Sequence, residues 1–338
     1  MKAFVYRNYG SPDVLRCEEV PKPTPGDGEI LVRIRAAAAN PMDYGLMSGV
    51  YLMRLMTGLR KPKPTRPGAD LAGEVEAVGK NVTRFQPGDP VFGAARGAFA
   101  EYVCAPEDKL ASKPANLTFE QTAAIPVAGS TALQGLRDKG RLQPGQRVLI
   151  NGAAGGVGTF AVQIAKSFGA DVTGVCSTGS VDLVRSLGAD HVVDYTRDDV
   201  TRSGEHYDLI FDCVGNRPLS AWRRVMTPTG TFVPVGLRPG GHWIAYLVKL
   251  LVSSRFVKQK VVFFMASIGP ADLIFLKDLI EANKVTPVVD RRYEFREAAE
   301  ALRYLKEGHA RGKVVIAVEH DSGSGPVEVK GVAARETR

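Results

Sequence analysis

Val148-Leu149-Ile150-Asn151-Gly152-Ala153-Ala154-Gly155-Gly156-Val157-Gly158 decides the fold of the second half of this 338-residue chain. A buried-strand pattern passes into a glycine-rich turn, and Val157–Phe168 has the apolar spacing of a helix closed by Gly169. Such a turn needs glycine because a Cβ would keep the backbone away from a pyrophosphate, toward which the N–H groups of the helix start are directed. The stretch therefore predicts a dinucleotide-binding unit; a purely structural glycine turn is the alternative.

The residues that follow this unit continue the alternation of strands and helices. Further apolar strands are predicted at Asp171–Cys176, His191–Asp194, Leu209–Cys213, Gly230–Val235 and Val261–Met265, with a helix over Val181–Leu187. Strands that alternate with helices favour a parallel sheet. The fold class predicted here is α/β, with a doubly wound parallel sheet of the Rossmann type.

The first 120 residues have a different texture. Short β-type runs such as Lys2–Tyr6 and Glu29–Ala36 are separated by proline-glycine turns, which indicates a β-rich domain. Helices are predicted at Phe119–Ala124, Ser130–Lys139, Ala271–Ala282 and Arg296–Glu307. A last strand, Gly312–Val318, has no sequence neighbour to pair with, so we expect it to return to the N-terminal domain. The predicted boundaries are residues 1–124 with 270–320 for the β-rich domain, 125–269 for the Rossmann domain, and 321–338 for a disordered tail.

Composition narrows the setting. Hydrophobic residues make up 44% and charged residues 24% of the chain, as in globular proteins with large cores. The four cysteines have no CxxC spacing, and the N-terminus lacks a signal-peptide pattern, so a cytoplasmic location is predicted. The net charge is +8, and residues 44–69 and 213–271 contain no acid. These segments are either solvated faces or a positive rim around a cleft. Nucleic-acid and membrane partners are not expected. The apolar segment Trp243–Phe256 is interpreted as a helix over the sheet or a cleft lid, with an interfacial membrane helix as the alternative.

The strand after the glycine turn bears on the choice of cofactor. An NAD site normally places Asp or Glu at the end of that strand to hold the ribose 2′-hydroxyl. Here the strand ends in Val175-Cys176-Ser177-Thr178-Gly179-Ser180, which contains no acid. The absence of a repulsive carboxylate predicts NADPH, although the loop lacks the basic residue that a 2′-phosphate would be expected to meet.

Several motifs together resemble the medium-chain dehydrogenase/reductase superfamily, and within it the quinone oxidoreductase-like group. Besides the AAGGVG turn, they are Arg35-Ala36-Ala37-Ala38-Ala39-Asn40-Pro41-Met42-Asp43, Gly68-Ala69-Asp70-Leu71-Ala72-Gly73, Gly97-Ala98-Phe99-Ala100-Glu101-Tyr102, Ser130-Thr131-Ala132-Leu133, Asp212-Cys213-Val214-Gly215 and Arg311-Gly312-Lys313-Val314-Val315-Ile316. The resemblance extends to about residue 318. It implies a GroES-like catalytic domain built from both ends of the chain, a cofactor cleft, and homodimers that pair through the last Rossmann strand.

The zinc-dependent branch of that superfamily offers a contrast. Its catalytic cysteine stands where this chain has Asn40, and its histidine stands where this chain has Ala69. Zinc requires three or four N, S or O ligands, so no metal site is expected, and none of the five histidines is assigned a role. Without a Lewis acid, an activated acceptor is favoured, because hydride addition to a quinone or an α,β-unsaturated carbonyl compound yields an enolate that hydrogen bonds can stabilise.

The resemblance also implies roles for individual residues. Apart from the resemblance, Tyr51 in the segment Met47–Arg66 could donate a proton or form a pocket wall. By the resemblance, Asn40 would lie near the nicotinamide and the acceptor. The other cofactor residues it implies are Thr131 at the domain junction, Gly155, Gly156 and Val157 at the pyrophosphate, Ser177 and Thr178 at the 2′-phosphate, Tyr195 at the adenine, Gly236 and Phe264 at the nicotinamide, and Lys313 reaching the pyrophosphate from the other lobe. Each has an alternative as an ordinary turn, helix, core or surface residue.

Two other functions stay open at this point. An enoyl-thioester reductase would suit the basic segments, because a carrier such as coenzyme A is phosphorylated. A non-catalytic protein that binds NADPH and RNA would suit the basic surface. The predicted function is NADPH-dependent reduction of a quinone or enone.

Overall fold

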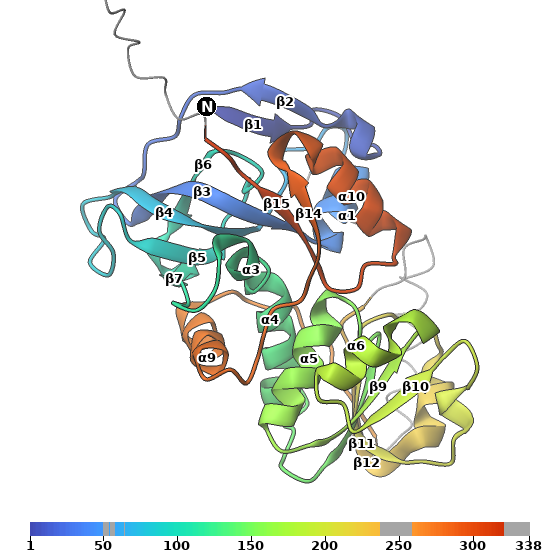
Figure 1. The fold of residues 1–338 in the computed structure, drawn as a ribbon. Coiled ribbons are helices and arrows are strands. Elements are labelled where there is room, and N and C mark those ends of the chain that lie inside the picture. The colour runs from blue at the N-terminus through green and yellow to red at the C-terminus, as the bar shows by residue number, and fades with distance from the viewer. Residues whose placement is uncertain (50–53, 55–57, 64, 237–258, 321–338) are drawn as a thin grey trace, which may run out of the picture.

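The computed structural model describes residues 1–49, 54, 58–63, 65–236 and 259–320, which form two stacked domains (Figure 1). Residue Tyr51, the segment Trp243–Phe256 and the tail from residue 321 lie outside the described residues. No helix of the described part is long and apolar enough to cross a membrane.

One domain is a six-stranded parallel sheet in the spatial order β10-β9-β8-β11-β12-β13. Its strands are β8 (Arg147–Asn151), β9 (Asp171–Cys176), β10 (His191–Asp194), β11 (Tyr207–Asp212), β12 (Met226–Pro234) and β13 (Lys260–Val261). Its helices are α5 (Gly156–Ser167), α6 (Val181–Ser186) and α7 (Leu219–Trp222). Numbered from β8, the strands follow the order 3-2-1-4-5-6, which confirms the predicted doubly wound Rossmann sheet. The central strands are almost continuously buried because the sheet is covered on both faces.

Two predicted elements were wrong in extent. The strand expected over Val261–Met265 is only β13, Lys260–Val261. Val262 still donates its N–H to the Phe232 carbonyl, but Pro234, the next β12 residue that would donate in the ladder, has no N–H, so pairing stops. The helix expected over Ser130–Lys139 begins earlier as α4 (Pro126–Leu133) and continues as a π-helical segment, Gln134–Lys139.

The other domain contains a seven-stranded sheet and a separate hairpin-like pair, β1 with β2. Its strands are β1 (Lys2–Val5), β2 (Arg16–Glu19), β3 (Glu29–Ala39), β4 (Asp70–Val78), β5 (Pro90–Ala94), β6 (Tyr102–Pro106), β7 (Leu110–Ser112), β14 (Val289–Glu294) and β15 (Lys313–Ala317). Its helices are α1 (Pro41–Ser48), α3 (Phe119–Ala123) and α10 (Ala298–Glu307), while α9 (Pro270–Glu281) lies with α4 where the two domains meet. β15, the last strand of the described residues, lies antiparallel beside β3, with Val315 opposite Ala38, as the sequence predicted (Figure 1).

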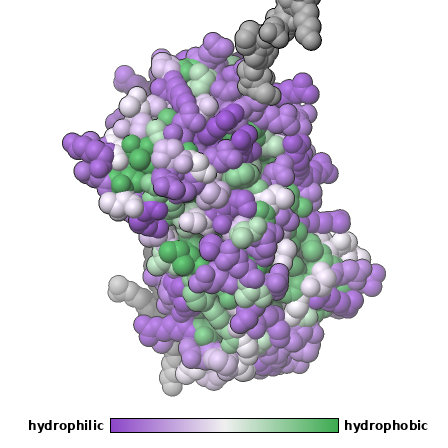
Figure 2. Space-filling view, turned by 60° about the vertical axis from the view of Figure 1, so that its left-hand side comes forward, coloured by the Kyte–Doolittle hydropathy of each residue, from purple (hydrophilic) through white to green (hydrophobic). Residues whose placement is uncertain are grey.

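The two domains share a continuous apolar core at their junction. One buried cluster joins Ala36 and Val315 of the seven-stranded sheet, α4, Ile150 of β8, and Leu276 of α9. Small alanine side chains on β3 let α3 pack closely on the sheet. Because α9 packs on both α4 and β7, it belongs to the junction rather than to one lobe, and the predicted domain boundaries stay a prediction. On the face that Figure 2 shows, hydrophilic residues predominate and groups of hydrophobic residues lie between them.

Candidate active site

The glycine turn between β8 and α5 has the backbone geometry that the sequence predicted. Gly152 has a φ of +82°, which favours glycine, and Gly155 is the residue before the first helical residue of α5. A Cβ on Gly158 would lie 2.1 Å from the carbonyl oxygen of Gly152, so the helix can pack on the turn only with glycine there. The first N–H groups of α5 therefore open at the carboxyl edge of the sheet, where a pyrophosphate can be held.

A buried carboxylate ties neighbouring loops together at the same edge. Asp212, the last residue of β11, accepts from the side-chain amide of Asn151 at 2.8 Å and from the N–H groups of Val214 and Gly215 at 3.0 Å each. Burial raises the pKa of Asp212, and these hydrogen bonds oppose the rise. A Cβ on Gly236 would lie 2.1 Å from the Cys213 carbonyl carbon. Gly236 is thus a close-packing glycine after β12, and its predicted place beside the nicotinamide stays a prediction.

The loop after β9 carries the residues predicted to meet the adenosine half of a cofactor. Thr178 donates its hydroxyl to Asp194 at 2.6 Å, at the end of β10, and lies 2.9 Å from the Thr196 hydroxyl. The hydrogen bond from Thr178, together with those that the Thr196 hydroxyl and N–H donate to Asp194, lowers the pKa of Asp194. Tyr195 is 54% exposed, and its N–H donates to the Cys176 carbonyl. An exposed aromatic ring fixed to the end of β9 is suited to pack on an adenine.

Lys313, Asn40 and Asp70 form a buried polar cluster in the opposing domain. The Lys313 ammonium donates to Asn40 Oδ1 at 2.7 Å and to Asp70 Oδ2 at 3.0 Å. Asn40 in turn donates to Asp70 Oδ2 at 3.0 Å and to the Ala38 carbonyl at 3.3 Å. The other Asp70 oxygen accepts from the N–H of Val127 at the start of α4. Asp70 is the residue that sequence reasoning missed, since it was noted only as part of a family motif.

The cluster faces the glycine turn through its lysine stem. A Cβ on Gly156 would lie 3.1 Å from Lys313 Cδ, so the stem crosses the domain boundary and contacts the turn. Its ammonium, however, points to Asn40 and Asp70. The structure therefore brings together Lys313, Asn40 and the turn residues, and the predicted contact between Lys313 and a pyrophosphate stays a prediction.

Asp43 holds the backbone next to this cluster in place. It accepts from the N–H of Asn40 at 2.8 Å and from the N–H of Gly68 at 3.2 Å, and so fixes the start of α1 against the loop before β4. Burial raises the pKa of Asp43 to about 7; the two backbone donors oppose the rise and the Asp70 carboxylate adds to it.

The raised pKa of Asp43 predicts a pH-dependent stability. Its carboxyl ordinarily loses its proton near 3.8 but keeps it to about 7 in the folded chain. Between these values the folded state binds more protons, so this stability is full below the lower value and is lost as pH rises through the upper one. Between about pH 5 and about pH 7.5, Asp43 should therefore lower the free energy of unfolding of the wild-type chain by roughly 2 kcal/mol. Asp43→Asn has no carboxyl to ionise and should not show this fall. Urea unfolding at both pH values checks this; equal slopes for both proteins would contradict it.

The remaining predicted residues lie around this centre. The Thr131 hydroxyl, partly exposed on α4, donates to the Val127 carbonyl at 2.7 Å, one helical turn back. Phe264 follows β13 and packs partly buried on the main core. Gly155, Gly156, Val157 and Ser177 lie in the turn and loop already described, while Tyr51 lies outside the described residues.

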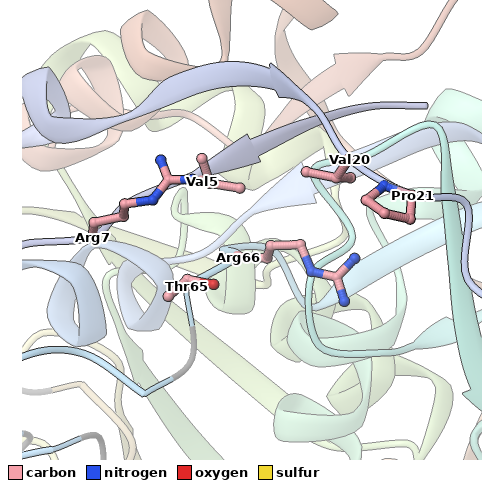
Figure 3. A pocket seen from close by; sticks show the side chains of 6 residues that line it. All are labelled: Val5, Arg7, Val20, Pro21, Thr65 and Arg66. Carbon is pink, nitrogen blue, oxygen red and sulfur yellow. The ribbon is translucent and has the colours of Figure 1, made fainter.

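A pocket of about 310 Å³ lies elsewhere, at the β1–β2 pair (Figure 3). Its lining residues are Val5, Arg7, Val20, Pro21, Thr65 and Arg66. None of them belongs to the glycine turn or to the Lys313 cluster, so this pocket is not the cofactor cleft.

Fold and site together define a two-domain oxidoreductase that binds a pyridine nucleotide between a Rossmann domain and a GroES-like domain. Family models described as alcohol dehydrogenase GroES-like domain and zinc-binding dehydrogenase match residues 26–115 and 187–316. The chain belongs to the medium-chain dehydrogenase/reductase superfamily, in its quinone oxidoreductase-like group.

Individual relatives are similar over nearly the whole chain. A 2-methylene-furan-3-one reductase of Solanum lycopersicum is 35% identical over 94% of this chain and 79% of its own. A chloroplastic NADPH-dependent alkenal/one oxidoreductase of Arabidopsis thaliana is 34% identical with the same coverage. The quinone oxidoreductase structure from Coxiella burnetii superimposes with a TM-score of 0.82 at 30% identity, covering 94% of this chain and 99% of that one.

Zinc, which one family model names, does not fit the residues present. Asn40 and Ala69 supply no thiolate or imidazole, and the Asp70 carboxylate already holds the Lys313 ammonium. In the described part of the chain no three His, Cys, Asp or Glu side chains gather as a metal site. A cation beside a buried ammonium would be repelled, so the cluster is organised around lysine instead of a metal.

Proposed function

We propose that this chain is an NADPH-dependent reductase that transfers a hydride to a quinone or an α,β-unsaturated carbonyl compound without a metal ion. The observation that carries the proposal is the glycine turn faced by Lys313 across the domain boundary, beside a β9 that ends without an acid. The acceptors named for the relatives, a furanone, alkenals and enones, and quinones, support the acceptor class.

When bound, NADPH supplies the hydride, and the chain's own residues bind, orient and shield. The pyrophosphate would be held at the start of α5 by Gly155, Gly156 and Val157. The Lys313 stem contacts this turn from the other domain. The buried apolar cluster at the domain junction, which includes residues of α4, provides surroundings in which hydrogen bonds act in a low dielectric.

Asn40 acts in this proposal through Lys313. Its carboxamide uses both donor hydrogens on Asp70 and Ala38 and accepts from the lysine. An amide so occupied orients the ammonium rather than the acceptor. The predicted catalytic role of Asn40 thus becomes a positioning role, while that of Tyr51 stays a prediction.

A panel assay tests the proposed function. NADPH oxidation is followed with a quinone, an enone and crotonyl-CoA, each repeated with NADH. We expect turnover of the quinone or enone, with kcat/KM at least about 10-fold higher for NADPH than for NADH. Turnover of crotonyl-CoA alone would favour the enoyl-thioester reductase. If NADPH is oxidised with none of the acceptors and the chain binds RNA in a salt-sensitive way, the non-catalytic alternative would be favoured over the enzyme.

The quaternary structure and location are proposed on narrower grounds. In the described part of the chain β13 is one of the two edge strands of the parallel sheet, and it offers a place for a second copy to pair and form a homodimer. Light scattering after gel filtration tests this, and a monomer would contradict it. A cytoplasmic location is also proposed, since the scattered cysteines suit a reducing compartment; fractionation of the source cells tests it, and recovery in an organelle would contradict it.

A further inference from the structure

Arg311 lies against the loop after β9, although it belongs to the other domain. A Cβ on Gly179 would be 2.8 Å from Arg311 Nη2 and 3.5 Å from its Cζ. The guanidinium thus takes the space that a side chain at position 179 would occupy. Its side chain is exposed, and within the described part of the chain it forms no ion pair.

The neighbours of Arg311 in sequence set its position. Gly312 has a φ of +127°, and a Cβ there would lie 2.5 Å from the Val288 carbonyl oxygen, so the backbone is held close to the residue before β14. Lys313 then contacts Gly156 in the pyrophosphate turn. Residues 311–313 therefore run from the loop after β9 to the glycine turn, the same two places that the adenosine and pyrophosphate of a dinucleotide must span.

We propose that Arg311 is the cation that binds the 2′-phosphate of NADPH, supplied across the cleft in place of a basic residue in the loop after β9. The proposal rests on the proposed function, because it names the residue that selects its coenzyme. A guanidinium offers paired donors that match phosphate oxygens.

The charges around the loop require such a cation. The Asp194 carboxylate lies beside Thr178, and a phosphate placed at this loop would be repelled by it. Arg197, 3.7 Å from Asp194, already has that carboxylate as a partner. Arg311 reaches the loop from the opposite side and is free to meet a second anion. Coenzyme selection would then depend on closure of the two domains, since the loop and the cation come from different lobes.

Coenzyme kinetics and ligand binding together test the proposal. In Arg311→Gln, kcat/KM for NADPH should fall about 10- to 100-fold, while kcat/KM for NADH should change less than about 3-fold. Adding Gly179→Lys to that variant should restore the NADPH preference, because a lysine at 179 would place a cation in the vacated space. Arg185→Gln, a similarly exposed arginine on α6, is the control for general charge and should leave both coenzymes unchanged.

Calorimetry with adenosine 2′,5′-bisphosphate and with 5′-AMP separates the two proposals. The wild-type chain should bind the bisphosphate more tightly, and Arg311→Gln should remove that difference, whether or not any acceptor is reduced. If no acceptor is reduced but the difference depends on Arg311, the proposed function fails and the assignment of Arg311 stands. If Arg311→Gln keeps the wild-type preference in both measurements, or Arg185→Gln loses it equally, Arg311 is not the phosphate ligand.

Discussion

Gly158→Ala is expected to unfold the glycine turn, whereas Gly155→Ala is expected to leave the fold intact and block the cofactor. The Cβ of an alanine at 158 would lie 2.1 Å from the Gly152 carbonyl oxygen and 2.8 Å from Ala153 Cα, and these backbone atoms cannot swing aside. The helix must then move off the turn. We expect a loss of about 3 kcal/mol or more in the free energy of unfolding, at the upper end for overpacked sites.

Gly155→Ala adds the same methyl group as Gly158→Ala, but at a position with space around it. Its backbone is extended, with φ −79° and ψ 174°, and a Cβ there would meet only the Gly152 oxygen, at an ordinary 3.4 Å. The added methyl group would instead project where the pyrophosphate approaches the N–H groups of α5. We expect thermal unfolding within about 2 °C of wild type but a KM for NADPH raised about 10-fold or more. An unchanged KM would show that this face of the turn does not meet the cofactor.

The Rossmann half was predictable because its signals are local. Each strand from β8 to β12 is an apolar run next to a helix or a turn, and the glycines Gly152 and Gly155 predict the turn from the sequence alone. The strand β14 was missed for the opposite reason: Val289-Asp290-Arg291-Arg292-Tyr293-Glu294 is an edge strand whose polar side chains resemble a loop.

The sequence indicated which residues belong to the site, but not which residues they form hydrogen bonds with. Asn40, Lys313 and the glycine turn were each singled out, yet their hydrogen bonds depend on where three distant segments meet. Nothing in the local pattern shows that Asp70 holds Lys313, or that Arg311 fills the space beside Gly179. The loop after β9 was expected to lack a basic partner, and within its own residues it does. The cation comes from a segment that only the tertiary fold brings near.

Lys313→Met is expected to destabilise the chain by about 3–5 kcal/mol, because it leaves the fully buried Asp70 carboxylate without its cation. A matched control is Lys166→Met, which removes an ammonium 2.7 Å from Asp190 where both side chains are about one-third exposed. Water can solvate Asp190 after that change, so the expected cost is below about 1 kcal/mol. Urea unfolding of the two variants compares one chemical change in two environments.

The double variant Lys313→Met/Asp70→Asn separates stability from function. An asparagine at 70 can still accept from the Val127 N–H, and the Asn40 carboxamide can turn so that its oxygen accepts from the new amide. We therefore expect the double variant to regain most of the free energy of unfolding lost by Lys313→Met. NADPH-dependent turnover should stay low, because the ammonium that Asn40 orients is gone. A double variant as unstable as the single one would mean that the methionine itself, and not the unpaired carboxylate, disrupts the cluster.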